Sequence, residues 1–308
     1  MNRYIRFPLC ALAACTLPAC TPGPPAPRAL VPIAGLERVL HGILAPLPDT
    51  LEVSIALLDL ATGDSLLVAA HTPMHAASTM KVPVMLELFR RADAGEISLD
   101  APIALRNDFR SIADGSAYAL SADDDSDREL YSRLGGSATV RELIERMIAR
   151  SSNLATNLLI DLAGPERIAR TLAELGAAET KVLRGVEDIP AYTAGMNNQT
   201  TAYGMMKVLQ GIASDRAASS AATEEMLAIL ERQEFREMIP AGLPEGVRVA
   251  NKTGWITGIN HDAAIVLPAE RSPYVLVVLT RGYHDREAAS QVAREISAAA
   301  YAALVRGE

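Results

Sequence analysis

The chain has 308 residues and a formal net charge of −8, with 49% hydrophobic and 21% charged residues. This length suits one large domain or two ordinary ones, with a core that needs no metal or disulfide. The acidic balance and the lack of Lys- and Arg-rich runs argue against nucleic acid as a partner. All three cysteines lie in the first twenty residues, so the rest of the sequence has no disulfide framework and no Cys-based zinc site.

The first twenty residues have the pattern of a secretory leader. A positive tip precedes a mostly apolar run that is too short for a permanent membrane-spanning helix. Leu-x-x-Cys occurs twice, ending at Cys15 and at Cys20, and both resemble the bacterial lipobox, whose cysteine receives a lipid. We expect a signal peptide of the lipoprotein type at 1–20 and a proline-rich, extended tether at 21–35. The protein is then exported to the periplasm or the outer face of the membrane and lipid-anchored, with plain secretion as the alternative.

The N-terminal part of the body alternates between helix and strand patterns. One helix and then two strands joined by a turn are predicted at 36–45, 53–60 and 65–69. Another helix is expected to begin at Ser78 or Thr79 and to end near Gly95. Pro83 then falls in the first turn, where its missing N–H costs little because early donors have no intrahelical partner.

The middle of the chain is helical apart from one polar excursion. Residues 107–133 are rich in aspartate, and we interpret them as a solvated surface loop, because the acidic residues lack the spacing of a calcium-binding loop. Thr139 to Glu142 is a capping box that begins a helix. Further helices are expected at 154–162, from Pro165 to Gly176, at 201–212 and at 223–232.

The last third changes character. Three strands with short turns are predicted at 247–256, 261–267 and 274–280. A long alanine-rich helix follows at 285–305. Strands at both ends with helices between them imply an α+β fold, in which an antiparallel sheet from both termini is flanked by helices and a helical lobe is inserted at about 100–215. We expect one body over 36–308.

Three short words occur in one order along this body. They are Ser-x-x-Lys at 78–81, Ser-Ser-Asn at 151–153 and Lys-Thr-Gly at 252–254. Each alone is weak, since Ser-x-x-Lys is expected about once by chance in a chain of this length. The ordered set, with each word at the start or end of an element, is far rarer.

The words supply complementary groups for acyl transfer. Ser78 and Lys81 share a helix face, so Lys81 can be the base that a serine hydroxyl needs to become a nucleophile. Burial and a second cation, Lys252, would lower the pKa of the Lys81 ammonium. Ser151 can relay protons, and Asn153 can bind a substrate amide and hold Lys81 in place.

The third word lies on a strand. Alternation puts Lys252 and Gly254 on one face and Thr253 on the other, unless the strand twists there. Lys252 and the Thr253 hydroxyl can bind a substrate carboxylate, and Gly254 lets substrate approach the backbone. The N–H groups of Trp255 and Ser78 can form an oxyanion hole. Taken singly, the three words are a helix cap, a helix break and a strand end, and Trp255 is a strand-edge aromatic.

The three words resemble those of class A β-lactamases and penicillin-binding proteins. Segments 153–159 and 241–244 are also similar to that family, and the resemblance covers roughly Leu36 to the C-terminus. It implies the serine β-lactamase/DD-peptidase fold and, as substrate, a small-molecule β-lactam or a peptidoglycan stem peptide. We expect no cofactor, no metal and a monomer. The resemblance assigns the nucleophile, its base, the proton shuttle and the carboxylate clamp to Ser78, Lys81, Ser151 and Lys252.

One segment departs from the family pattern. In β-lactamases the omega loop, here 184–201, carries the glutamate that activates the deacylating water, and Glu187 is the first candidate with Asp188 second. The spacing Glu-x-x-x-Asn is not reproduced, since Asn197 and Asn198 lie much later. Glu187 can equally form a loop-closing ion pair with Arg184 at i+3.

The second word also differs, because Ser152 replaces a mainly structural aspartate. Ser-x-Asn is equally the peptidase version. The sequence therefore predicts a β-lactamase of class A type that opens the ring through a Ser78 acyl-enzyme and confers resistance. The alternatives are a D-alanyl-D-alanine carboxypeptidase or related peptidoglycan enzyme, and a non-catalytic β-lactam-binding sensor. Fast hydrolysis of the acyl-enzyme needs a base on a positioned water, so Glu187 decides among them.

Overall fold

The computed structural model describes residues 34–283 and 285–307. The chain divides into a short unit up to Leu30 and a large one from Val31, and all described residues belong to the large one. The predicted signal peptide, both lipobox cysteines and nearly all of the predicted tether lie outside the described residues. None of the helices in the described ranges is long and apolar enough to cross a membrane.

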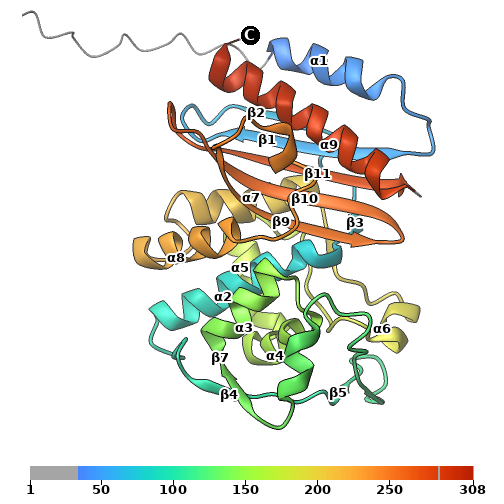
Figure 1. Cartoon of the computed structure of the whole chain (residues 1–308), viewed down its shortest axis with the longest axis vertical. Coiled ribbons are helices and arrows are strands. Elements are labelled where there is room, and N and C mark those ends of the chain that lie inside the picture. Colours follow the sequence, from blue (N-terminus) through green and yellow to red (C-terminus); the bar gives the residue numbers. More distant parts are fainter. Residues whose placement is uncertain (1–33, 284, 308) are drawn as a thin grey trace, which may run out of the picture. The chain divides into compact units, whose positions relative to one another are not determined.

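A five-stranded antiparallel sheet lies at the centre of this unit, with the strand order β2-β1-β11-β10-β9. The N-terminal strands, β1 (Glu52–Asp59) and β2 (Ser65–Val68), form the predicted hairpin. The C-terminal strands are β9 (Arg248–Ile256), β10 (Gly258–Leu267) and β11 (Tyr274–Tyr283). Strand β1 pairs with β11, so both ends of the body build one sheet (Figure 1). The predicted α+β class is confirmed.

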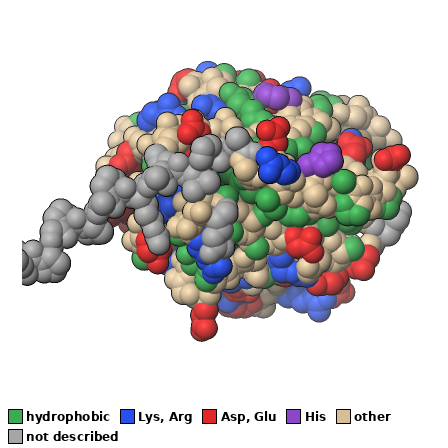
Figure 2. Space-filling view, turned by 90° about the horizontal axis from the view of Figure 1, so that it is seen from above, with side chains coloured by type: hydrophobic (Ala, Val, Ile, Leu, Met, Phe, Trp, Pro, Cys, Tyr) green, Lys and Arg blue, Asp and Glu red, His purple; other side chains and the backbone are tan. Residues whose placement is uncertain are grey.

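Helices cover both faces of this sheet (Figure 1). On one face lie α1 (Ala34–Leu44) and α9 (Arg286–Tyr301), which contact each other and are followed by a π-helical turn at Ala302–Arg306. Seen from this side, acidic and basic side chains stand among apolar ones (Figure 2). The other face meets α7 (Ala202–Ala213) and α8 (Ser220–Glu231).

The alternation of β11 explains why both faces are covered. Leu276 and Val278 belong to the core under α1 and α9, whereas Val275 and Val277 belong to the larger core on the helical side. Successive side chains of a strand point to opposite faces, so an unbroken apolar run needs a core on each side. The central strand therefore requires a layer of helices on both faces of the sheet.

The remaining helices surround α2 (Lys81–Asp93), which contacts α3, α4, α5, α7 and α8. These neighbours include α3 (Val140–Ala149), α4 (Asn153–Ala163) and α5 (Pro165–Glu174). The short α6 (Ile189–Thr193) follows α5 in the chain. The short strands form pairs, namely β3 (Met74–His75) with β8 (Gln199–Thr200), β4 (Pro102–Ala104) with β7 (Ser137–Thr139), and β5 (Phe109–Arg110) with β6 (Ala117–Tyr118).

The helix that carries the first word begins in two steps. A 3₁₀ turn covers Ala77–Met80, and the α-helix proper begins at Lys81. Pro83 lies in the first turn of that helix, as predicted, where an N–H has no partner to lose. Gly95, with φ of 71°, follows the end of the helix. Ser78 therefore precedes the α-helix, and Lys81 is its first residue.

The interpretation of 107–133 as a solvated loop is wrong for two of its aspartates. Asp125 and Asp127 are buried. Asp127 pairs with Arg146 at 3.0 Å and with Arg150 at 3.3 Å. Both arginines follow the loop on or just after α3, so an acidic run that looks solvated in the sequence acquires its partners only through the fold.

Candidate active site

The fold brings the three words together. The first lies on η1 (Ala77–Met80) and the start of α2, the second at the start of α4, and the third on β9. The Lys81 ammonium donates to the Ser151 carbonyl (2.6 Å), the Ser151 hydroxyl (3.1 Å) and Asn153 Oδ1 (3.0 Å). From the opposite side, the Lys252 ammonium donates to the same Ser151 hydroxyl (3.1 Å) and to the Thr253 carbonyl (2.9 Å). The Ser151 hydroxyl therefore lies between two amines that come from residues 171 positions apart.

Both amines are fully buried. Burial lowers the pKa of Lys81 to about 7, and the negative charge of Asp125 opposes part of this effect. Burial also lowers the pKa of Lys252 well below its usual range, and the neighbouring charge of Lys81 adds to it. An amine with a pKa near 7 is partly neutral at physiological pH, and it can then accept a proton.

Ser78 lies against β9 through a close backbone approach. A Cβ at Gly254 would come within 2.7 Å of the Ser78 amide nitrogen and 2.8 Å of that of Thr79. Only glycine allows this contact. Gly254 faces Ser78 and Lys252 faces Ser151, as the predicted alternation requires, and Thr253 lies between them opposite Asp262 of β10.

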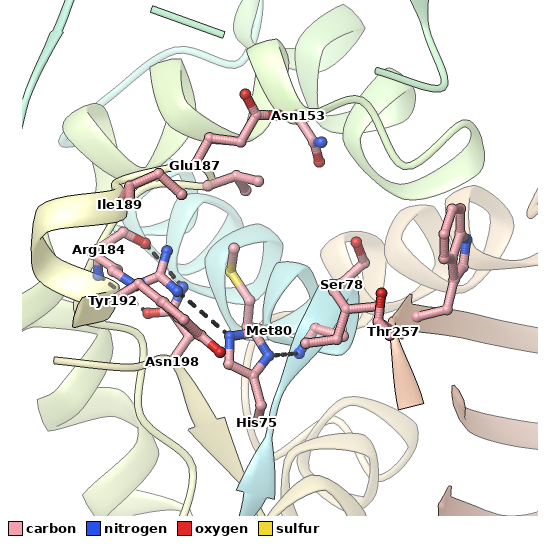
Figure 3. Close-up of a pocket in the computed structure, with 14 residues that line it drawn as sticks. His75, Ser78, Met80, Asn153, Arg184, Glu187, Ile189, Tyr192, Asn198 and Thr257 are labelled. Atoms are coloured by element: carbon pink, nitrogen blue, oxygen red, sulfur yellow. Dashed lines mark hydrogen bonds between the residues drawn. The ribbon is translucent and has the colours of Figure 1, made fainter. Parts of the chain in front are cut away.

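A cavity of about 410 Å³ lies beside Ser78. In Figure 3, Asn153 and Glu187 lie in the upper part of the view, Met80 near the centre and His75 below it. Ser78 lies near Thr257, across from Arg184. Trp255 also lines the cavity, with 52% of its surface exposed and the Arg286 guanidinium 4.8 Å from its ring centre. The tryptophan is thus a wall of the site as well as an exposed aromatic at the end of β9.

Glu187 lines the same cavity as Ser78 and Asn153. Its predicted ion pair with Arg184 is wrong. The Arg184 guanidinium donates instead to the Gly185 carbonyl (3.0 Å) and to Asn197 Oδ1 (3.2 Å), and within the described ranges it forms no ion pair with Glu187. Burial raises the pKa of the Glu187 carboxyl above its usual range. The carboxyl is therefore free of an arginine and faces the cavity.

Two asparagine side chains hold the omega loop in place. Asn157 of α4 pairs with the backbone of Val186, donating to its carbonyl (3.0 Å) and accepting from its N–H (2.6 Å). Asn198 accepts the N–H groups of Leu183 and Arg184 and donates to the Arg184 carbonyl. The two side-chain amides thus satisfy backbone N–H and C=O groups of the loop, as a neighbouring strand would do in a sheet.

Asp188, the second candidate base, has a different environment. It is fully buried and caps α6, accepting the Ala191 N–H (3.1 Å), while its other oxygen accepts the Ile112 N–H (3.0 Å). Both oxygens are therefore engaged by backbone donors. This geometry gives Asp188 a loop-capping role and leaves Glu187 as the carboxyl on the cavity.

Residues 36–304 match the family described as the beta-lactamase enzyme family. The chain belongs to this family. A β-lactamase of Bacillus licheniformis is 30% identical over 146 residues, which are 46% of this chain and 48% of that protein. The chain thus spans about half the length of the curated relatives that it matches.

Solved structures of the family extend the likeness to nearly the whole body. The crystal structure of a β-lactamase from Sphaerobacter thermophilus has a TM-score of 0.74 and 27% identity, covering 89% of this chain and 98% of that one. The structure of PBP-A has a TM-score of 0.75 and 23% identity, covering 90% of this chain and 98% of that one. At this level of identity the similarity supports a shared fold only.

Backbone strain in this β-lactamase-family protein gathers at the site. Ala77, Ser151 and Glu187 have φ angles of 45°, 60° and 62°, and the described residues contain only two other non-glycine residues with positive φ. A positive φ costs energy in these residues because the Cβ crowds the backbone, and such residues cluster at functional sites, where the rest of the fold holds them in place. Ala77 directly precedes Ser78, Ser151 carries the shared hydroxyl, and Glu187 lies at a bend of the omega loop.

Two histidines that belong to none of the three words, His75 and His261, support the turn before the nucleophile. His75 Nδ1 accepts the Ala77 N–H (3.0 Å), which fixes the residue before Ser78. His261 contacts the His75 carbonyl through Nε2 (3.0 Å), and its Nδ1 accepts the Thr280 N–H, so Nε2 carries the proton. Burial lowers the pKa of His261 to about 4, which keeps it neutral. No local signal links residues 186 positions apart.

Proposed function

We propose that this protein is a serine β-lactamase that opens the β-lactam ring through an acyl-enzyme on Ser78 and then hydrolyses that ester. The main support for the proposal is the Ser151 hydroxyl, which accepts hydrogen bonds from two buried amines. Nearby, the Glu187 carboxyl lines the cavity beside Ser78 and, among the described residues, forms no ion pair with an arginine. Membership of the beta-lactamase enzyme family over 36–304 supports it.

In acylation, the neutral amine of Lys81 takes the proton of the Ser78 hydroxyl, and the oxygen attacks the lactam carbonyl carbon. The N–H groups of Ser78 and Trp255 stabilise the resulting oxyanion. The proton passes through Ser151 to the lactam nitrogen, the C–N bond breaks, and the ring opens. Lys252, with the Thr253 hydroxyl, binds the carboxylate of the substrate.

In deacylation, we assign the base to Glu187. Its carboxylate takes a proton from a water molecule, whose oxygen attacks the ester carbonyl carbon. The bond between that carbon and the Ser78 oxygen then breaks, the serine oxygen takes the proton, and the ring-opened acid leaves. Burial raises the pKa of this carboxyl, which makes it a stronger base once it is ionised. Its place beside Ser78 and Asn153 on the cavity supports this assignment.

The rim of the cavity favours substrates with an apolar acyl side chain. Four large hydrophobic residues that line it are exposed, with Ile189 at 62%, Trp255 at 52%, Tyr192 at 51% and Ile256 at 37%. Exposed apolar surface at a concave site is typical of ligand contact. We propose that the acylamino group lies between these residues, with its amide on Asn153.

A chromogenic cephalosporin tests the proposal. Fast multiple turnover supports a β-lactamase. A stoichiometric adduct on Ser78 without turnover would contradict it and would favour a peptidase or a sensor. Release of D-alanine from a peptide ending in D-alanyl-D-alanine then identifies the carboxypeptidase.

We further propose that residues 36–308 form the catalytic domain, as a monomer, with a helical lobe at about 100–215. The signal peptide at 1–20 and tether at 21–35 would place it on the periplasmic side or outer face of the membrane through a lipid on Cys20 or Cys15. Incorporation of labelled palmitate into single Cys→Ala variants at these two positions tests the anchor. Labelling of neither cysteine in the unaltered chain would contradict it.

A further inference from the structure

Asp125, in the loop at 107–133, accepts four hydrogen bonds, two from its own loop and two from α4. One carboxylate oxygen accepts the N–H groups of Asn153 and Leu154, each at 2.9 Å, and the Tyr131 hydroxyl at 2.9 Å. The other oxygen accepts the Asp127 N–H at 3.0 Å. Only 4% of the residue is exposed. A loop residue thus binds the first two N–H groups of α4.

Among the described residues, no Lys, Arg or His forms an ion pair with Asp125. Within the part of the chain that the structure describes, the nearby arginines Arg146 and Arg150 pair with Asp127 and Glu129 instead. A buried carboxylate is then stabilised by backbone donors and by the positive end of the helix. Its negative charge also raises the pKa of Lys81 against the effect of burial.

Asp125 and Lys81 bind the same segment, residues 151–153. The Lys81 ammonium donates to the Ser151 carbonyl and to the Asn153 side chain, and Asp125 binds the Asn153 backbone. Ser152, between these two residues, is buried and caps Ala155 with its hydroxyl, so it brings no charge to the site.

We propose that Asp125 is a positioning residue for Lys81, supplying from a separate loop the carboxylate that the Ser-Ser-Asn word lacks. The inference rests on the proposed acyl transfer. Asp125 acts in two ways: it fixes the turn that bears the acceptors of the Lys81 ammonium, and its charge holds that ammonium's proton affinity near neutral pH. Other charged or titratable groups near this centre include Lys252 from β9, Glu187 from the omega loop, and Asp124, Asp127 and the Tyr131 hydroxyl from the loop of Asp125 itself.

An asparagine cannot replace this carboxylate without loss. All four groups around Asp125 are donors toward it. In one orientation the amide nitrogen of an asparagine faces the Asp127 N–H, and in the other it faces three donors, so at least one buried donor loses its acceptor. Asp125→Asn removes the charge and disturbs the geometry together, with almost no change in volume.

The test is the single-turnover rate of Ser78 labelling by a fluorescent penicillin, measured across pH. In Asp125→Asn we expect the maximal rate to fall about tenfold or more, since misplacement of a reacting group is costly. We also expect the acidic limb to move to lower pH, because loss of a nearby negative charge lowers the pKa of Lys81. The matched control is Asp123→Asn, which removes the same charge from an exposed residue of the same loop and leaves both quantities unchanged.

A second variant separates positioning from folding. Adding Ser152→Asp to Asp125→Asn returns a carboxylate to the segment, and we expect the acidic limb to move back toward that of the unaltered protein. An Asp125→Asn protein with a lower melting temperature but an unshifted limb would overturn the inference, because its role would be structural only. An unaltered protein that takes no label would instead refute the proposed function.

Discussion

The two halves of the candidate site are built differently. Ser78, Lys81, Ser151 and Lys252 lie on or next to regular elements, namely a 3₁₀ turn, α2, α4 and β9. Glu187 lies on an irregular loop that side-chain amides fasten to its neighbours. Groups on helices and strands share the stability of the whole core, whereas a loop opens locally when a few bonds are lost. Acylation and deacylation should therefore respond differently to mutation.

The largest effect is expected at the nucleophile. Ser78→Ala removes the oxygen that forms the ester, so turnover should fall on the order of 10⁴-fold or more, as for loss of other catalytic serines. Covalent labelling by penicillin should disappear, which mass spectrometry of the intact protein measures. Retention of the label at another residue would show that the assignment of the nucleophile is wrong.

Glu187→Gln should separate the rates of acylation and deacylation most clearly. The amide keeps the shape of the side chain but cannot accept the proton of water, so we expect deacylation to slow about 10²- to 10⁴-fold while acylation changes little. The adduct should then accumulate and be visible by mass spectrometry. Glu174→Gln, on the exposed end of α5, is the control. Unchanged turnover in the Glu187 variant would remove it from the mechanism.

The pH dependence of acylation tests only the half of the site that lies on helices and strands, through the pKa of Lys81. Lys81 must be neutral to act as base, and its pKa is about 7. The labelling rate should therefore be constant above pH 8 and fall about tenfold for each unit below the pKa. Stopped-flow labelling between pH 5 and 9 measures this limb. A rate that stays flat down to pH 5 would contradict the assignment of Lys81 as the base.

The smallest effect is expected behind the omega loop. Asn157→Ala leaves the Val186 N–H and carbonyl without their partners, which should cost about 1–3 kcal/mol of stability. Because Glu187 follows Val186, deacylation should slow about tenfold as its carboxyl loses orientation. Thermal melting and the lifetime of the adduct measure the two quantities. An equal loss in acylation would show that the two halves are not separable in this way.

The fold could be read from the sequence because its signals are local and consistent. The unbroken apolar run of β11 requires a core on both faces, and the cap formed by Thr139 starts α3 where the pattern predicts it. Errors occurred where a partner is remote. The acidic run around Asp127 predicts a solvated loop, because nothing in that run shows that Arg146 and Arg150 will pair with it. The spacing of Arg184 and Glu187 predicts an ion pair, but the fold directs the guanidinium to Asn197 instead.

Local patterns are enough to predict the α+β class and the residue types at the site, since periodicity and short words depend only on neighbouring positions. The fold is needed to show that Lys81 and Lys252 share one hydroxyl, and that Asp125 binds the backbone next to it. The reason is physical: the pKa of a buried amine and the orientation of a loop carboxyl depend on atoms tens to hundreds of residues away, and folding alone brings those atoms within hydrogen-bonding distance.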